Sequence, residues 1–148
     1  MCLAGRDLTE PKPSPDGATV AFVARWAAAA IIVVPIEGGP ERIVTTGPEP
    51  SPGRGLGGGC FDWLPDGSGL VYAARDGNLW LQPLSGAPEP VTRVAEGSTY
   101  AAPCMTPDGG GVVSVIDQAA VWWHPLGASD GRRARRLDEG RADFVVDP

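Results

Sequence analysis

Few side chains in this sequence have the chemistry of a catalytic group. His124 is the only histidine, and therefore the only ordinary general base near neutral pH. A general base also needs a nucleophile and an orienting partner, and no pattern around His124 supplies them. The sequence contains no GxSxG nucleophile elbow. We therefore predict no catalytic residue and no enzymatic activity for these residues by themselves.

The cysteines do not form a recognisable metal or redox motif. Cys2, Cys60 and Cys104 contain no CxxC pair, and one histidine adds no ligand spacing. Their odd number is typical of a reducing compartment. We expect Cys60 and Cys104, which precede two of the turns described below, to be buried free thiols. No metal site is predicted.

Two stretches resemble ligand-binding motifs but lack the required context. Residues Gly53 to Gly58 satisfy GxGxxG, which binds a pyrophosphate only between a strand and a helix, so we interpret them as a loop. The basic run Arg132 to Arg136 could contact phosphate or RNA. The whole chain is acidic, however, with a net charge of −6. We interpret the run as the charged edge of an outer strand, and we predict no cofactor and no nucleic-acid partner.

A four-residue turn motif recurs three times and organises the chain. In each copy Pro has the φ that suits the second position of a type I turn, and Gly stands fourth, where a left-handed backbone is needed. The Asp between them can accept backbone N–H bonds within the turn. The three predicted corners are Ser14-Pro15-Asp16-Gly17, Leu64-Pro65-Asp66-Gly67 and Thr106-Pro107-Asp108-Gly109.

Short β-prone runs surround each corner. An entering strand precedes it, two apolar strands follow, and an outer strand comes after a Gly-containing turn. Asp76-Gly77 and Asp117-Gln118 are predicted two-residue hairpin turns, whereas Ala27 to Ala30 indicate a longer connection in the first copy. Proline cannot donate to a ladder, so the prolines that close the second apolar run should lie at strand ends. These are Pro35, Pro83 and Pro125.

The repeat predicts a β-propeller. Four short strands per unit, with 50 and 42 residues between the Asp of successive corners, are typical of propeller blades. The inner strands are apolar at consecutive positions, so neighbouring sheets should bury both faces, with Trp80 and Trp122 at corresponding positions. The predicted fold class is all-β: a partial β-propeller of three four-stranded antiparallel blades plus the start of a fourth. The expected divisions are blade 1 at about 8–45, a Gly/Pro-rich loop at 46–57, blade 2 at about 58–93, blade 3 at about 100–137 and a truncated blade 4 from about 142.

These motifs carry a family resemblance. The Pro-Asp-Gly corner, its apolar strand and the run Asp76-Gly77-Asn78-Leu79-Trp80-Leu81-Gln82-Pro83-Leu84 resemble the PD40 or TolB-type propeller repeat. The residues before each corner are similar to the N-terminal propeller of S9 (prolyl oligopeptidase family) peptidases of the acylaminoacyl-peptidase-like kind. The resemblance implies a substrate-gating cap over an α/β-hydrolase domain that carries Ser, Asp and His. No catalytic residue is carried over to this chain. The residues that carry this similarity to the S9 propeller are Leu8-Thr9-Glu10-Pro11, Phe61-Asp62-Trp63, Ala142-Asp143-Phe144 and Asp147-Pro148.

Two classes of function stay open. The first is a non-catalytic gating piece of a serine peptidase, with a peptide substrate only in the context of a hydrolase domain. The second is a TolB-like protein-interaction module. Met1 to Asp7 has no apolar signal-peptide core, which favours the first class and predicts a cytoplasmic chain. The apolar run Ala27 to Val34 stops at Pro35, so we expect no membrane span.

An incomplete propeller should associate. The first and third blades each leave one apolar face without a neighbour. We expect the side chains of these two faces to include Val20, Ile32, Val112 and Trp122. At about 25 cal/mol per Å2, several hundred Å2 of bare apolar surface forgoes several kcal/mol. Two copies meeting face to face through a symmetric contact would give a six-bladed ring.

Overall fold

The computed structural model describes residues 6–52, 59–127 and 133–138, and these form three four-stranded antiparallel sheets. The predicted all-β class is confirmed. The first sheet contains β1 (Asp7–Pro13), β2 (Thr19–Arg25), β3 (Ala29–Pro35) and β4 (Arg42–Ile43). The second contains β5 (Phe61–Trp63), β6 (Gly69–Ala73), β7 (Leu79–Pro83) and β8 (Glu89–Pro90). The third contains β9 (Tyr100–Met105), β10 (Gly111–Ile116), β11 (Ala120–Pro125) and β12 (Arg135–Arg136).

The Pro-Asp-Gly corners join the first two strands of each sheet, as predicted. Each Gly has a left-handed φ, between 73° and 75°, and its N–H donates to the carbonyl of the first corner residue. The Asp carboxylate accepts the N–H two residues later, at 3.0 Å from Ala18, 2.9 Å from Ser68 and 2.8 Å from Gly110. Hydrogen bonds from Ser14 and Ser68 lower the pKa of Asp16 and Asp66. The Asp of the motif thus closes its own turn.

The hairpins after the corners differ from the sequence prediction. In the second sheet, the Ala74 N–H donates to the Asn78 carbonyl, which leaves a three-residue loop closed by Gly77 at φ 89° instead of a two-residue turn. In the first sheet, Arg25 pairs with Ala29 across a loop of the same length, so the prediction of a longer connection was wrong. The strands of the first hairpin are longer instead: β2 and β3 have seven residues each, whereas β6 and β7 have five each.

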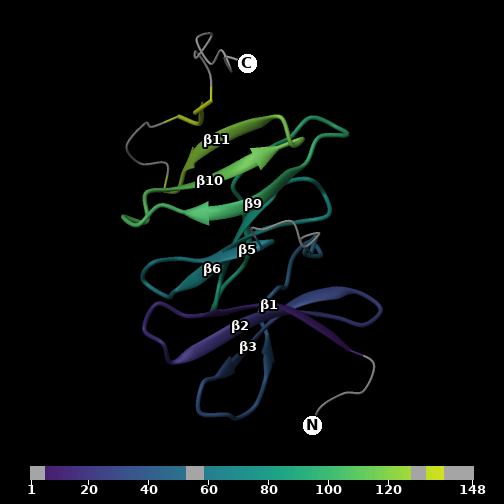
Figure 1. The fold of residues 1–148 in the computed structure, drawn as a ribbon, viewed down its shortest axis with the longest axis vertical. Coiled ribbons are helices and arrows are strands. Elements are labelled where there is room, and N and C mark those ends of the chain that lie inside the picture. The colour runs from purple at the N-terminus through teal and green to yellow at the C-terminus, as the bar shows by residue number, and fades with distance from the viewer. Residues whose placement is uncertain (1–5, 53–58, 128–132, 139–148) are drawn as a thin grey trace, which may run out of the picture.

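The three sheets stack face to face in chain order, with β5 and β6 between the other two sheets (Figure 1). One core cluster joins the first sheet to the second, and another joins the second to the third. All five residues of β6 are buried, because its side chains enter both clusters. The described residues therefore form a partial β-propeller. The expected fourth entering strand, at 142–148, lies outside them.

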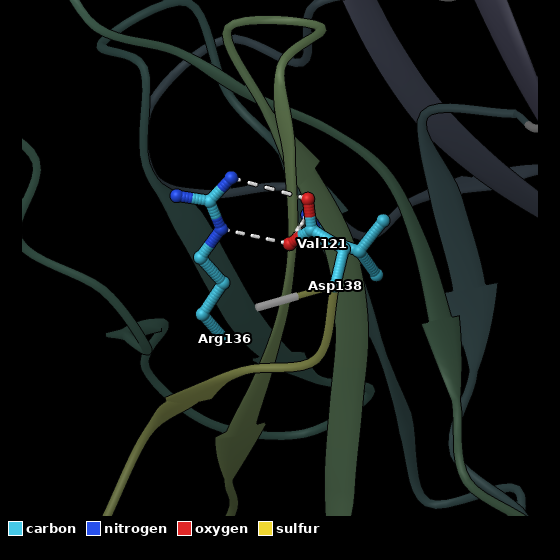
Figure 2. A network of polar contacts seen from close by, with 3 residues as sticks. All are labelled: Val121, Arg136 and Asp138. Carbon is cyan, nitrogen blue, oxygen red and sulfur yellow. Dashed lines mark hydrogen bonds and ion pairs between the residues drawn. The ribbon is translucent and has the colours of Figure 1, made fainter. Parts of the chain in front are cut away.

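The outer strands are short. In each sheet, a side chain just past the outer strand continues the hydrogen bonding to the third strand. In each sheet, the third strand donates a backbone N–H to a side-chain oxygen just past the outer strand. In the third sheet, the Val121 N–H donates to Asp138 at 3.1 Å, and Arg136 donates to the same carboxylate at 2.8 and 3.2 Å (Figure 2). These hydrogen bonds, Arg136 first, lower the pKa of Asp138 to about 2. Thr45 and Thr92 take the corresponding place, accepting from Ile31 at 3.2 Å and Leu79 at 2.9 Å.

The connection from β10 to β11 stores backbone strain that a single substitution should release. Asp117 and Gln118 have φ of 51° and 56°, the left-handed values of a type I′ turn, which cost a non-glycine residue about 1 kcal/mol. Gln118→Gly should therefore raise the free energy of unfolding by about 0.5 kcal/mol or more. Ala119→Gly is the matched control, because Ala119 has no positive φ and Gly there only adds freedom to the unfolded chain. If denaturant melts show Ala119→Gly to be more stable than Gln118→Gly, the strain at Gln118 is contradicted.

Candidate interaction surface

The first strands of the sheets hold several of the polar contacts that join one sheet to the next. The Lys12 ammonium of β1 donates to the Phe61 carbonyl of β5 at 2.7 Å and lies 5.4 Å from the centre of its ring. The Trp63 indole N–H donates back to the Lys12 carbonyl at 2.9 Å. The Glu10 carboxylate accepts the Cys60 N–H. Each of these contacts crosses the junction between the first and second sheets.

Asp62 makes the equivalent contact at the next junction. It stands four residues before its corner Asp, as Lys12 does in the first sheet. Its carboxylate accepts the Trp63 N–H at 2.9 Å and, from the third sheet, the Met105 N–H at 2.7 Å. Cys104 holds the same place in the third sheet. It is exposed, so the prediction of a buried thiol was wrong there.

Bulges at residues before proline shape two of these strands. Glu10 and Ala102 have φ of 58° and 52°, and the ladder register shifts at both places. A bulge re-aims the side chain that it carries, and here the Glu10 carboxylate reaches the neighbouring sheet. The aligned prolines Pro11 and Pro103 were the sequence signal for this feature, which the turn pattern alone did not predict.

His124 lies between the second and third sheets, and no nucleophile among the described residues is hydrogen-bonded to it. Its ring packs edge-on against Tyr100 at 4.9 Å and stacks on Trp122 at 6.1 Å. It is buried, and its Nε2 has no hydrogen-bond partner among the described residues. Burial lowers the pKa of His124. Ser114 is a buried hydroxyl residue on the same sheet, and its Oγ is likewise without a partner among the described residues. No hydrogen bond links the two side chains.

The remaining chemical candidates are scattered. Cys60 is buried, and desolvation followed by the charge of Glu10 raises the pKa of its thiol, which makes it a poor nucleophile. Among the described residues, no three His, Cys, Asp or Glu side chains are grouped so as to hold a metal ion. Cys2, Arg132 and the GxGxxG stretch at 53–58 lie outside those residues. No described helix is long and apolar enough to cross a membrane.

A basic hollow lies on the outer side of the third sheet. Its volume is about 360 Å3, and its walls include Thr106, Asp108 and Trp123 together with Arg133 and Arg135. The Arg135 guanidinium lies 5.2 Å from the centre of the Trp123 ring. The sequence predicted a charged outer edge here, and β12 is indeed the exposed outer strand. Arginine stacked on tryptophan is a common arrangement in protein interfaces.

Comparison with known proteins gives a likeness of fold. No family model matches the sequence, and no curated protein matches it. Among solved structures, a prolyl endopeptidase superposes with a TM-score of 0.67 and 19% identity, covering 92% of this chain and 22% of that one. An oligogalacturonate lyase in complex with manganese superposes with a TM-score of 0.64 and 21% identity, covering 88% of this chain and 38% of that one.

A third structure agrees with the other two. An oligogalacturonate lyase from Vibrio parahaemolyticus has a TM-score of 0.58 and 19% identity over 86% of this chain and 38% of that one. The chain thus spans well under half the length of these propeller proteins. At these identities the likeness concerns the propeller fold alone.

Asp62 should be a stabilising residue of the junction between the second and third sheets. Asp62→Ala leaves the buried Met105 N–H without its acceptor, which should lower the free energy of unfolding by about 1–3 kcal/mol. Asp62→Asn keeps an amide oxygen and should cost less. Urea melts of the three proteins provide the measurement. Equal stability of the alanine variant and the parent would show that this hydrogen bond contributes nothing.

The lowered pKa of His124 should make stability depend on pH. Because the folded pKa lies below the unfolded value of about 6.5, the unfolded chain binds more protons below that pH. The free energy of unfolding should therefore be highest above about pH 6.5 and should decrease as the pH falls below that value. His124→Gln, which copies Gln82 of the second sheet, should flatten this slope. Tyr100, the titratable neighbour of the ring, has a raised pKa and stays neutral in this range. Identical slopes in the two proteins would refute the assignment.

Proposed function

We propose that this chain is a non-catalytic propeller piece of a serine peptidase, in which stacked blades gate the access of peptides to a separate α/β-hydrolase domain. The observation that carries the proposal is the threefold Pro-Asp-Gly unit folded into stacked four-stranded sheets. The superposition with a prolyl endopeptidase over 92% of the chain supports it as an analogy of fold. A peptide is then the substrate of the assembled enzyme.

A TolB-like protein-interaction module is the second candidate. It is favoured by the large apolar side chains exposed on the outer face of the first sheet, since such patches commonly mark binding surfaces. They are Leu8, Ile36 and Ile43, with exposed fractions of 49%, 58% and 51%.

A hydrolysis assay tests the non-catalytic assignment. The purified chain should not cleave chromogenic proline-containing peptides or acyl-peptides above background, because His124 has no nucleophile within hydrogen-bonding reach among the described residues. His124→Ala is the matched control, and it should leave that background unchanged. Turnover that survives stringent purification and disappears in His124→Ala would overturn the assignment.

The genomic reading frame separates the two candidates. The gating proposal predicts in-frame sequence beyond residue 148 that encodes further Pro-Asp-Gly corners and a GxSxG motif. A frame that continues into unrelated sequence would contradict the peptidase and favour the interaction module.

A further inference from the structure

Several apolar side chains that were expected on open sheet faces are covered in the structure. Val112 is buried against the second sheet, at the junction where Trp122 stacks on His124. Ile32 of the first sheet is only 2% exposed. An opening of a different kind lies between the first and second sheets. Both of its walls belong to described residues, so it does not depend on a neighbour outside them.

This opening is a hollow of about 440 Å3 with a largely apolar wall. Its volume is within the usual range for small-ligand pockets, about 300–1,000 Å3. Leu84 of the second sheet forms one side of the hollow. The first sheet supplies the rest, including the apolar residues Val33, Pro35 and Pro40.

Two polar side chains stand on opposite sides of this apolar floor. Thr19 of β2 pairs with Pro35, and Arg42 of β4 pairs with Val33, so the two β3 residues lie between them. Arg42 donates from Nη1 to the Leu84 carbonyl at 2.7 Å. Among the described residues, no carboxylate lies within 4 Å of its guanidinium, and the Thr19 hydroxyl has no hydrogen-bond partner. Both groups therefore keep hydrogen-bonding capacity that the fold does not use.

The one negative charge beside the hollow is already compensated. Glu41 accepts hydrogen bonds from both η nitrogens of Arg6, at 2.7 and 3.0 Å. The side chain of Arg6 is 5% exposed, which makes this pair part of the folded structure. The charge that the hollow offers to a ligand is thus the positive charge of Arg42.

The other two sheets lack this combination of groups. Gly69 and Gly111 take the place of Thr19, since each pairs with the proline that ends its third strand. A side chain at either glycine would collide with its own sheet. Glu89 takes the place of Arg42 in the second sheet, and the third sheet has an arginine there but glycine opposite it. The repeat folds without this pair of groups, so the folding of the sheets does not account for them.

We propose that this hollow binds the C-terminal residue of a peptide whose last side chain is apolar. The α-carboxylate accepts from the remaining donors of Arg42, because guanidinium and carboxylate form short, charge-assisted hydrogen bonds. The apolar side chain lies on Val33, Pro35 and Leu84. The Thr19 hydroxyl, on the other side of β3, hydrogen-bonds to the last peptide group. Such a site does not require the proposed gating role, because the first two sheets contain all of it.

The composition of the hollow favours this ligand over other anions. A phosphate or a nucleic acid would meet a single positive charge and would leave the apolar floor uncovered. An Asp or Glu within a peptide carries its charge at the end of the side chain, and no apolar group accompanies it. A terminal residue bears a carboxylate and an apolar side chain on the same carbon atom. It therefore satisfies the arginine and the floor together.

Nuclear magnetic resonance titration of the 148-residue chain with N-acetyl-Ala-Ala-Leu tests the proposal. The backbone signals of Thr19, Arg42 and Leu84 should shift. The C-terminal amide of the same peptide should bind at least about tenfold more weakly, because it lacks the charged acceptor. Free leucine should also bind more weakly than the peptide, because its ammonium group replaces the last peptide group beside a positive charge.

Variants locate the contact. Arg42→Gln keeps a donor for the Leu84 carbonyl and should weaken binding of the acid at least about tenfold, without changing the binding of the amide. Thr19→Phe fills the hollow and should abolish binding. Arg93→Gln, at an exposed arginine of the second sheet, is the matched control and should leave the affinity unchanged. Circular dichroism melts verify that each variant is folded.

The comparison of acid and amide needs no variant, so the parent chain alone can refute the proposal. Equal affinity for the two peptides overturns it, and so does the absence of any shift at millimolar peptide. Binding of free leucine as tight as that of the peptide would overturn the peptide as the ligand. Shifts centred on the indole N–H of Trp123 would place the peptide in the basic hollow of the third sheet and overturn the assignment.

Discussion

A β-sheet that is apolar on both faces must be covered on both sides, and this constraint governs the whole molecule. β6 is its clearest case, since all five residues are buried and their side chains enter two separate core clusters. A single such sheet in water would expose most of this area, at a cost of about 25 cal/mol per Å2. Stacking satisfies the constraint for the second sheet and half satisfies it for the first and third.

Apolar contact does not by itself fix how one sheet lies on the next, because it has little directionality. The hydrogen bonds between neighbouring first strands contribute to that direction. Lys12 contacts Phe61 at one junction, and Asp62 accepts from Met105 at the other. The same place in each repeat thus carries a side chain of opposite charge, yet each reaches a backbone group of the following sheet. The role of the position is preserved although its chemistry is not.

The stack has consequences for how function should be sought. The groups that suggest catalysis in the sequence are part of the packing: His124 lies between aromatic rings, and Cys60 lies under the first junction. Arg133 and Arg135 stay accessible beside Trp123, on the outer side of the third sheet.

The sequence by itself determined the corners, the strand order and the propeller class, because a type I turn with Pro and a left-handed Gly depends on four adjacent residues. Thr45, Thr92 and Asp138, which extend the outer strands, were readable only in part, since their role depends on pairing across a sheet. The tertiary structure alone decided which face of each sheet is covered. Val112 and Val113 are adjacent and similar, yet only Val112 is fully buried. The direction of stacking arises from contacts between distant residues, and no local pattern encodes it.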